Sequence, residues 1–469
     1  MTDDRLTQPF VEKMRDAGLP QLAIDTFRLH LERLASGETG LLTRNRIDPV
    51  EQIPDATAFA DHKPAGEAAA ARTVVIKLNG GLGTSMGLDR AKSLLTVRDG
   101  LTFLDLIARQ VLALRRASAR VVPLVLMNSF RTDEESVAAL RSHEGIEIEG
   151  VPLAFLQHKV PKVDVQQRVP ASFPGDPELE WCPPGHGDLY TAMATSGMLD
   201  RLLDRGVEYA FVSNADNLGA VLDVSLLGYM DTEGLDFVME AARRTAADRK
   251  GGHLCRLTGD GRLALRESAQ CPDEESDEFQ DVDRYRFFNT NSVWIRLPAL
   301  RKLLDDHRGV VPLPTIVNRK KVDPRDPRST PVIQLETAMG AAISLFDRAA
   351  AVLVPRSRFS PVKTTNDLLG VRSDAYLLTP DARVVLDPDR DGPPSIDLDP
   401  AFFKLIDEFE ARFPTGAPSL RRCLGLLVRG DVTFGRGVVV EGHVEIDARQ
   451  PTRIDDGAVL RDLPPNDTV

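Results

Sequence analysis

Residues 73–93 combine glycine and lysine in a spacing that suits phosphate binding. An apolar run from Val74 to Leu78 has the length of a buried strand. Glycine then fills four of the eight positions from 80 to 87, and Lys92 follows. Glycine lets the backbone approach a ligand closely with its N–H groups exposed, and Lys92 adds a positive charge within reach. The stretch therefore predicts a strand, a phosphate-binding loop and a lysine that act on the same anion.

Two well-known phosphate loops do not match this stretch. The P-loop carries glycine immediately before Lys-Ser, where this chain has Ala91. The dinucleotide-binding fingerprint is G-x-G-x-x-G, whereas Gly81, Gly83 and Gly87 are spaced G-x-G-x-x-x-G. That fingerprint also needs an acidic residue after the second strand, but residues 127–129 read Met-Asn-Ser. A tight loop that binds no ligand is the alternative interpretation.

Polar residues follow four expected strands, which cover residues 74–78, 121–127, 153–156 and 209–212. Helices are expected between them, one begun by a capping box of Thr132 and Glu135 and another spanning 188–204. This alternation predicts a parallel sheet with helices on both faces. Because the carboxyl ends of parallel strands meet at one edge, the polar residues should converge there. They are Asn79, Asn128, Gln157, Asn214 and Asp216.

Two of these residues suggest a nucleotide ligand. The Gln157 amide can present a donor and an acceptor to a pyrimidine edge. The Asp216 carboxylate can bind Mg²⁺, which prefers one or two carboxylates together with phosphate oxygens. Ordinary turn chemistry, such as an Asx turn at Asp216, is the alternative.

Three later segments also carry polar side chains that could act on a ligand. A Pro-Pro-Gly-His-Gly-Asp turn ends at residue 188 and places His186 near the start of a helix, where anions are favoured. Asn289 and Asn291 lie amid aromatic residues in a strand over 286–297 and suit sugar hydroxyls, or else mark a bulge. In the basic loop 355–365, Arg356, Arg358 and Lys363 suit a triphosphate, or else form a solvated turn.

Composition limits the class of protein. A chain of 469 residues predicts two or three domains. Its net charge of −12, from 70 acidic and 58 basic residues, argues against nucleic acid as a partner. No apolar run approaches the roughly 20 residues that cross a bilayer, and the N-terminus does not resemble a signal peptide. Four scattered cysteines fit reduced thiols, so a soluble, cytoplasmic protein without a membrane partner is expected.

The two ends of the chain have their own patterns. Residues 1–40 read as helical, with Ala23, Phe27, Leu31 and Leu34 on one face, and residues 44–66 read as a connection. Near the C-terminus, apolar residues recur every six positions, a period typical of a parallel β-helix whose open end favours a homo-oligomer contact. They are Leu426, Val432, Val438 and Val444. The expected domains are a helical extension over 1–70, a catalytic domain over 71–420 and a β-helix over 421–469.

Several segments together resemble the UTP–glucose-1-phosphate uridylyltransferases of the eukaryotic type. The match begins with Leu-Asn-Gly-Gly-Leu-Gly-Thr-Ser-Met-Gly at 78–87 followed by Lys92 and Ser93, and it covers about residues 45–450. The other similar segments are 183–188, 214–219, 288–291, 334–338 and 355–365. Ala91 departs from the proline that the family usually has before the lysine, and Met339 stands where alanine is common.

The resemblance implies a fold and an activity. The fold is α/β, with a Rossmann-like nucleotidyltransferase domain, a mixed and mainly parallel sheet, an N-terminal helical extension and a C-terminal left-handed parallel β-helix. The activity is formation of UDP-glucose and pyrophosphate from UTP and glucose 1-phosphate, by Mg²⁺-assisted in-line attack on the α-phosphate. No nucleophilic side chain is needed for such a transfer.

The resemblance also implies roles for residues. Lys363 and Lys92 are the expected catalytic residues, and Asp216 is the expected metal ligand. The expected UTP-binding residues are Leu78, Asn79, Gly80, Gly81, Lys92, Gln157, Gly185, Asn214 and Lys363. The expected glucose 1-phosphate-binding residues are Gly81, His186, Asn214, Asp216, Asn289, Asn291 and Glu336, the last of which is expected to open an alanine-rich helix.

Three other functions compete with this interpretation. One is a uridylyltransferase that acts on N-acetylhexosamine or on several sugar phosphates, which the segments at 288–291 and 361–365 disfavour. The second is an NAD oxidoreductase, which the glycine spacing disfavours. The third is a catalytically silent nucleotide-binding protein, which the presence of Lys92, Asp216 and Lys363 disfavours.

Overall fold

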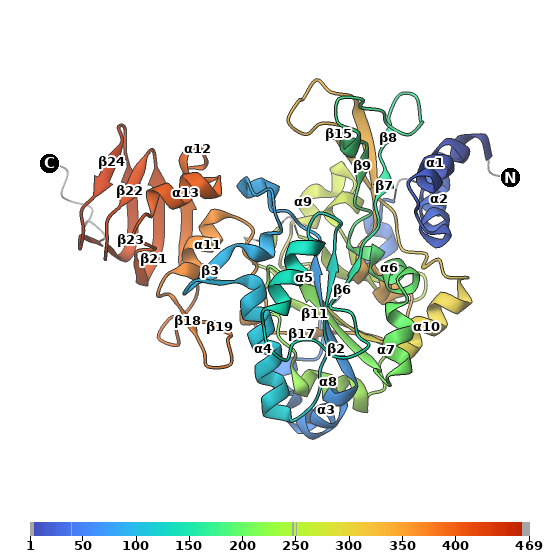
Figure 1. Ribbon diagram of the computed structural model, residues 1–469, viewed down its shortest axis with the longest axis horizontal. Coiled ribbons are helices and arrows are strands. Elements are labelled where there is room, and N and C mark those ends of the chain that lie inside the picture. The colour runs from blue at the N-terminus through green and yellow to red at the C-terminus, as the bar shows by residue number, and fades with distance from the viewer. Residues whose placement is uncertain (1–3, 39, 246–247, 250, 462–469) are drawn as a thin grey trace.

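The chain folds around a mixed β-sheet of ten strands (Figure 1), in a computed structural model that describes residues 4–38, 40–245, 248–249 and 251–461. Seven strands follow the order β1–β12–β14–β10–β2–β5–β6, while β11 pairs with β14 and β17, and β13 pairs with β12. Their bounds are β1 Ile47–Pro49, β2 Thr73–Asn79, β5 Leu124–Asn128, β6 Ala154–Leu156, β10 Tyr209–Asn214, β11 Phe237–Arg243, β12 His253–Leu257, β13 Leu263–Arg266, β14 Phe287–Arg296 and β17 Ala349–Leu353.

Most of these strands run in one direction. The pairs β10–β2, β2–β5, β5–β6 and β11–β17 are parallel. Strand β14 runs antiparallel to β10, β11 and β12, and β1 and β13 run antiparallel to β12. The predicted mixed, mainly parallel sheet is confirmed.

Helices cover both faces of the sheet because its central strands are apolar on both sides. Along β2, Val75 faces one core, while Val74 and Ile76 face the other. The first core is closed by α3 (Lys63–Ala69), α4 (Phe103–Ser118), α5 (Asp133–Arg141) and α8 (Val224–Thr232). The second is closed by α6 (Leu189–Thr195), α7 (Met198–Asp204) and α10 (Leu297–Asp306), on the other side of the sheet in Figure 1.

The N-terminal helices α1 (Asp4–Asp16) and α2 (Gln21–Ala35) pack beside a small sheet. Phe27 and Leu31 share a core with Ile333 and Leu335, so the predicted apolar face of α2 is confirmed. The small sheet consists of β8 (Val163–Asp164), β15 (Ile316–Lys321) and β16 (Pro331–Glu336), with a β7–β9 pair (Val160–Pro161 and Trp181–Cys182) nearby. The expected connection over 44–66 instead contains β1 and the start of α3.

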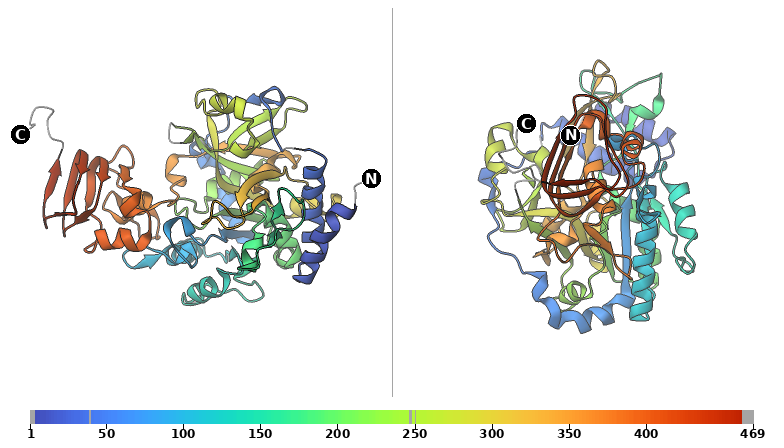
Figure 2. Two further views of the ribbon diagram at one scale, coloured as in Figure 1. Left: turned by 90° about the horizontal axis from the view of Figure 1, so that it is seen from above. Right: turned by 90° about the vertical axis from the view of Figure 1, so that its left-hand side faces the viewer.

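The C-terminal part lies at the end of the molecule opposite the N-terminus (Figures 1 and 2). Its four-stranded sheet is parallel. Leu426 pairs with Val444, and the distance of eighteen positions between them equals three of the predicted six-residue repeats. A second parallel pair joins β22 to β24. The strands are β20 Ser395–Leu398, β21 Ser419–Arg429, β22 Val432–Phe434, β23 Val439–Asp447, β24 Thr452–Ile454 and β25 Val459–Arg461.

Short elements join this part to the central sheet. Its apolar interior is continuous with the core beneath α4, since Val428 and Phe103 belong to the same cluster. The connecting elements are β3 Thr96–Arg98, β4 Leu101–Thr102, α11 Thr365–Arg372, β18 Tyr376–Leu378, β19 Val384–Leu386, α12 Pro400–Phe403 and α13 Ile406–Arg412, while α9 (Ser276–Phe279) lies in the middle of the chain. Among the described helices, none combines the length and apolar character needed to span a membrane.

Three local predictions are wrong. The helix expected over 188–204 is two helices, because Gly197 adopts a left-handed conformation with φ of 71°. The Thr132 capping box does not form, since the hydroxyl group donates to the Asn79 carbonyl oxygen instead. Glu336 ends strand β16 and does not open a helix, because residues 331–336 pair with β15.

Candidate active site at the carboxyl ends of the parallel strands

A pocket of about 300 Å³ lies at the carboxyl edge of the parallel strands. Strand register explains why polar residues meet there. Asn214 lies opposite Leu78, and Asn79 lies opposite Asn128. The predicted site residues that line the pocket are Leu78, Asn79, Gly80, Gly81, Lys92, Gln157, Gly185, His186, Asn214 and Asp216.

The glycine loop leaves its backbone open to this pocket. A Cβ atom at Gly81 would meet nothing within 4 Å, whereas one at Gly80 would lie 2.6 Å from the Gln157 amide nitrogen. The loop folds back so that the Lys92 N–H donates to the Gly81 carbonyl oxygen at 3.1 Å. Gly80 and Gln157 therefore lie too close together for a larger residue at 80, and the Lys92 backbone is tied to the loop.

The Asn79 side chain turns away from the pocket. Its amide donates to Asn128 Oδ1 and to Ser136 Oγ, both at 2.8 Å, and the side chain is buried. Asn79 thus connects the ends of β2 and β5 to helix α5. In this structure it offers the pocket its backbone and not its amide.

Asp216 joins two lysines that are far apart in the sequence. Its Oδ2 atom accepts hydrogen bonds from Lys92 Nζ and Lys363 Nζ, both at 2.9 Å. The Val362 N–H donates to the Asp216 carbonyl oxygen at 3.1 Å, and Lys92 Nζ also donates to the Val362 carbonyl oxygen. Burial alone would raise the pKa of Asp216, but Lys363 and Lys92 together hold that pKa below its usual value. Asp216 is therefore an ionised carboxylate between two cations.

The second oxygen of Asp216 could hold a metal ion. Oδ1 is buried and has no hydrogen-bond partner among the described residues. Those residues contain no group of three or more His, Cys, Asp or Glu side chains arranged for a metal. One carboxylate fits Mg²⁺, which often takes its remaining ligands from substrate phosphates and water.

His186 is held as a neutral imidazole. Its Nδ1 accepts a hydrogen bond from the Met339 N–H at 3.0 Å, so its proton lies on Nε2. Burial, with a contribution from Lys363, lowers the pKa of His186 to about 4. The ring can therefore donate from Nε2 to an anion without carrying a charge.

Two predicted motifs pair with each other to hold this histidine. The Thr337 N–H donates to the Pro184 carbonyl oxygen at 2.9 Å, and the Gly187 N–H donates to the Thr337 carbonyl oxygen at 2.9 Å. Gly185 has φ of 80°, and a Cβ atom there would lie 2.4 Å from that Thr337 oxygen and 3.2 Å from Glu336 Cβ. Only glycine fits this turn, and Glu336 lies beside it.

Asn289 and Asn291 lie outside the lining of the pocket, on β14. Val293 pairs with Val212 on the antiparallel strand β10. Two positions before Val293 and two positions after Val212, the same register brings Asn291 level with Asn214. The Asn289 amide donates to Asn291 Oδ1 at 2.9 Å, and Asn291 has φ of 57° where the β11–β14 register shifts. Both amides thus lie near the strand-end edge and are bonded to each other.

The sequence had suggested that the basic loop presents three cations to a ligand, but two of them are paired with acidic residues of the protein. Arg358 is buried and forms an ion pair with Glu240, and Arg356 forms one with Asp248. Lys363 alone of the three reaches Asp216, and its side chain is 55% exposed.

Sequence reasoning missed a His158–Asp188 pair beside Gln157. Asp188 Oδ2 accepts from the His158 N–H at 2.6 Å, Asp188 Oδ1 lies 2.9 Å from His158 Nδ1, and Thr195 Oγ1 lies 3.0 Å from His158 Nε2. This pair fixes the residue after Gln157 to the turn that carries Gly185. The only sequence signal was that His158 directly follows Gln157 at a strand end.

Ala91 holds the backbone in a conformation that proline also adopts. Its φ is −54°, within the range to which a proline ring confines the chain. The alanine therefore leaves the entry to Lys92 in the shape that the family proline would give it.

Comparisons with known proteins identify the family of the chain. The family model described as UTP--glucose-1-phosphate uridylyltransferase matches residues 24–441. An enzyme of that name from Hordeum vulgare is 43% identical over 396 residues, covering 83% of this chain and 80% of its own. The Saccharomyces cerevisiae enzyme of that name is 42% identical, covering 84% of this chain and 77% of its own.

Solved structures show the same likeness over nearly the whole chain. A UDP-glucose pyrophosphorylase from Leishmania major, an L281D mutant in complex with UDP-glucose, has a TM-score of 0.91 at 44% identity, with 98% of both chains covered. A UDP-glucose phosphorylase from Trypanosoma brucei has a TM-score of 0.88 at 47% identity, covering 97% of this chain and 98% of its own. This chain belongs to the UTP–glucose-1-phosphate uridylyltransferase family.

Proposed function

We propose that the pocket transfers the uridylyl group of UTP to glucose 1-phosphate, forming UDP-glucose and releasing pyrophosphate. The observation that carries the proposal is the convergence of a glycine loop, two lysines and one carboxylate at a single strand-end edge. Pyrophosphate release, measured with UTP, TTP and ATP and several hexose 1-phosphates, tests it. UTP with glucose 1-phosphate should be the preferred pair, and no release with that pair would contradict the proposal.

UTP lies along the glycine loop in this proposal. The backbone of Leu78, Asn79, Gly80 and Gly81 faces the phosphates and the ribose, and Asn214 adds a polar group at the end of β10. Gln157 reads the uracil edge, and Gly185 lines the pocket beside the ring. Lys92 and Lys363 bind the phosphates. To do so, their ammonium groups replace hydrogen bonds to Asp216 with hydrogen bonds to phosphate oxygens.

Glucose 1-phosphate binds on the side of the pocket that carries His186. The neutral His186 donates from Nε2 to the sugar phosphate, and Gly81 and Asn214 border the same space. Asn289, Asn291 and Glu336 bind the sugar hydroxyl groups. To bind the sugar, the amides of Asn289 and Asn291 replace the hydrogen bond between them with hydrogen bonds to the ligand.

Asp216 is the proposed ligand of Mg²⁺, through the oxygen that has no partner. When bound, the ion would neutralise phosphate charge and orient the reacting oxygens. Asp216 also holds Lys92 and Lys363 in place, so the carboxylate has a role of its own on the protein side.

The reaction is a direct displacement at phosphorus. A phosphate oxygen of glucose 1-phosphate bonds to the α-phosphorus of UTP, and the bond from that phosphorus to the bridging β-phosphate oxygen breaks. Pyrophosphate leaves with the bonding electron pair. Since both reactants are polyanions, Lys92, Lys363 and the loop N–H groups lower the barrier by neutralising charge and by holding the reactants in line.

We infer that the three predicted parts of the chain keep their roles, with a helical extension over 1–70, a catalytic domain over 71–420 and a β-helix over 421–469. Parallel pairing at intervals of 18 to 20 residues supports the β-helix. The half-exposed Val459 on its last described strand supports a homo-oligomer contact, which light scattering of the purified chain would detect. A cytoplasmic location stays a prediction.

Replacing Gln157 with alanine should narrow the preference for UTP over CTP. The amide matches the uracil O4 and N3–H groups, and a wrong base would leave that amide unpaired in the complex. The change should reduce the UTP to CTP ratio of kcat/KM about 5- to 150-fold, since one lost polar match costs about 1–3 kcal/mol. Steady-state kinetics with both nucleotides measures this ratio.

The exposed Gln167 provides a matched control for that change. Gln167→Ala should leave the ratio as it is in the unaltered protein. An unchanged ratio in Gln157→Ala would remove the case for uracil recognition by this residue.

A further inference from the structure

A buried ion pair lies beneath the candidate active site. Arg358 Nε and Nη2 donate to the two carboxylate oxygens of Glu240 at 2.8 and 2.6 Å, a two-pronged arrangement that only arginine makes. Glu240 is fully buried on β11 and also accepts a hydrogen bond from Trp294 Nε1 at 2.9 Å. Arg358 is thus fixed to the central sheet, although it belongs to the loop that carries Lys363.

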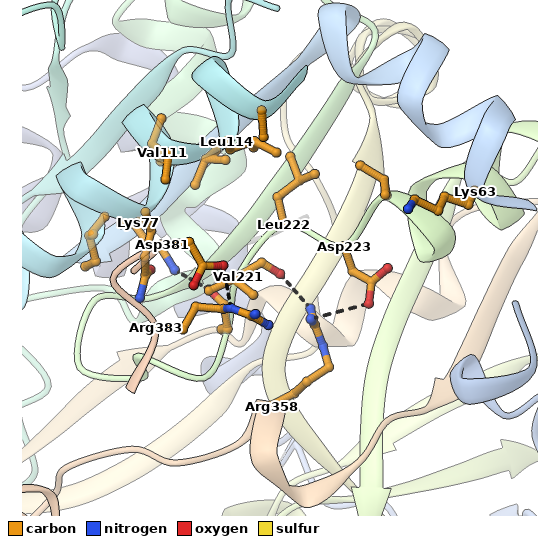
Figure 3. A pocket seen from close by; sticks show the side chains of 17 residues that line it. Lys63, Lys77, Val111, Leu114, Val221, Leu222, Asp223, Arg358, Asp381 and Arg383 are labelled. Carbon is orange, nitrogen blue, oxygen red and sulfur yellow. Dashed lines mark hydrogen bonds and ion pairs between the residues drawn. The ribbon is translucent and has the colours of Figure 1, made fainter. Parts of the chain in front are cut away.

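The same arginine holds the loop that follows Asp216. Arg358 Nη2 donates to the Val221 carbonyl oxygen at 2.9 Å. From the strand below, Lys77 Nζ donates to the Ala220 carbonyl oxygen at 2.7 Å and to Ser213 Oγ at 2.7 Å. Figure 3 shows Arg358 reaching Val221 and Asp223 at the side of a cavity of about 510 Å³, with Lys77 further along that cavity. Two buried basic side chains therefore anchor neighbouring carbonyl groups of one loop.

A side chain on the other side of this loop connects it to the Lys363 loop. The Asn217 amide donates to the Arg358 carbonyl oxygen at 3.0 Å, and Asn217 Oδ1 accepts from the Ser360 N–H at 3.0 Å. The backbones also approach closely, since a Cβ atom at Gly219 would lie 2.3 Å from the Ser357 carbonyl oxygen. The loops carrying Asp216 and Lys363 are therefore joined through Asn217 and, from beneath, through Arg358.

We propose that Arg358 is a positioning residue for the uridylyl transfer, because it fixes the Lys363 loop to the Asp216 loop. The proposal rests on the proposed function, in which Lys363 and Asp216 act on the phosphates. Arg358 itself is buried against Glu240 and is not among the residues that line the candidate active-site pocket. Its effect on the reaction comes from geometry, and a misplacement of about 1 Å in a catalytic group can cost on the order of 100-fold in rate.

The test replaces Arg358 with lysine, which keeps the positive charge but cannot bridge both oxygens of Glu240 and the Val221 carbonyl oxygen. We expect kcat to fall about 10- to 100-fold, with KM for both substrates changing less than about threefold. The matched control is Arg383→Lys, because Arg383 lines the same cavity and is paired with Asp381. Within the described part of the chain, no hydrogen bond or ion pair links its side chain to either loop. The control should keep the kcat of the unaltered protein. An unchanged kcat in Arg358→Lys would overturn the proposal.

A double-mutant cycle with Lys363→Ala tests whether Arg358 acts through Lys363. If it does, adding Arg358→Lys to Lys363→Ala should lower kcat by less than about twofold further. If the two losses multiply, Arg358 does not position Lys363 and the proposal fails. The outcome is distinct from failure of the proposed function, in which Lys363→Ala alone would leave kcat unchanged.

A second variant covers the case in which Arg358→Lys does not fold. Asn217→Ala removes the two side-chain hydrogen bonds that join the Asp216 loop to the Lys363 loop, and it leaves no buried charge unpaired. With Tm monitored throughout, this variant should also lower kcat, and the loss should again vanish in the Lys363→Ala background. A loss that persists there in full would overturn the proposal.

Discussion

Replacing Lys363 with alanine should lower kcat about 100- to 1,000-fold, equivalent to roughly 3–4 kcal/mol, because one electrostatic contact to the developing charge is lost. The structure gives the reason, since Lys363 Nζ lies 2.9 Å from Asp216 Oδ2, at the site proposed for the metal and the phosphates. The lysine side chain is 55% exposed, so no packing around it blocks its transfer from Asp216 to the substrate. Both kcat and kcat/KM should fall, with modest change in either KM.

Two further variants sharpen this prediction. Lys363→Arg should restore only part of the rate, since a planar guanidinium does not replace a compact ammonium group. Lys320→Ala, at an exposed lysine on β15, should behave as the unaltered protein. If Lys363→Ala keeps kcat and raises only the KM for UTP, Lys363 binds substrate and transition state equally, and Lys92 becomes the better candidate.

Replacing Asp216 with asparagine should reduce kcat at least about 100-fold while the fold is retained. The change removes the carboxylate proposed for Mg²⁺ and also the negative charge that lies between Lys92 and Lys363. Without it, the two ammonium groups repel each other in the ligand-free protein. Activity measured across a Mg²⁺ titration, together with Tm, separates loss of metal from loss of structure.

The exposed Asp200 on α7 offers the matched substitution. Asp200→Asn should leave the Mg²⁺ dependence of the unaltered enzyme. A near-normal rate of Asp216→Asn at saturating Mg²⁺ would show that the metal assignment is wrong.

The sequence predicts well which residues meet at the strand-end edge of the candidate site, because strand direction alone brings them together. Apolar runs of strand length followed by Asn79, Gln157 and Asn214 suffice, once the intervening helices imply parallel strands. The structure places these strand ends side by side in register.

Contacts between distant segments are not readable in the same way. Two backbone contacts in the site depend on long-range packing that no local pattern encodes. They join Thr337 to Pro184 and Val362 to Asp216. For the same reason, Glu336 was expected in a helix although it ends β16.

The direction of a polar side chain is equally hidden. Arg358 and Lys363 belong to one basic loop, yet Arg358 turns inward to a fully buried Glu240 and Lys363 turns toward Asp216. The position of Lys77 is visible in the sequence, because a lysine within a run of Val and Ile must be buried with the strand. Burying a lysine costs free energy unless its ammonium group finds hydrogen-bond partners. Burial lowers the pKa of Lys77 to about 7, and it is retained there with two hydrogen-bond partners.

In the proposed reaction, UTP and glucose 1-phosphate react directly with each other in this pocket, with no covalent intermediate on the protein. The stereochemistry at the α-phosphorus tests it most directly, because a single in-line displacement inverts that centre and two successive displacements retain it. With UTP made chiral at the α-phosphorus by sulfur substitution, we expect the α-thio analogue of UDP-glucose with inverted configuration. Retention of configuration would rule out direct displacement, because it would require a nucleophilic side chain and a covalent intermediate.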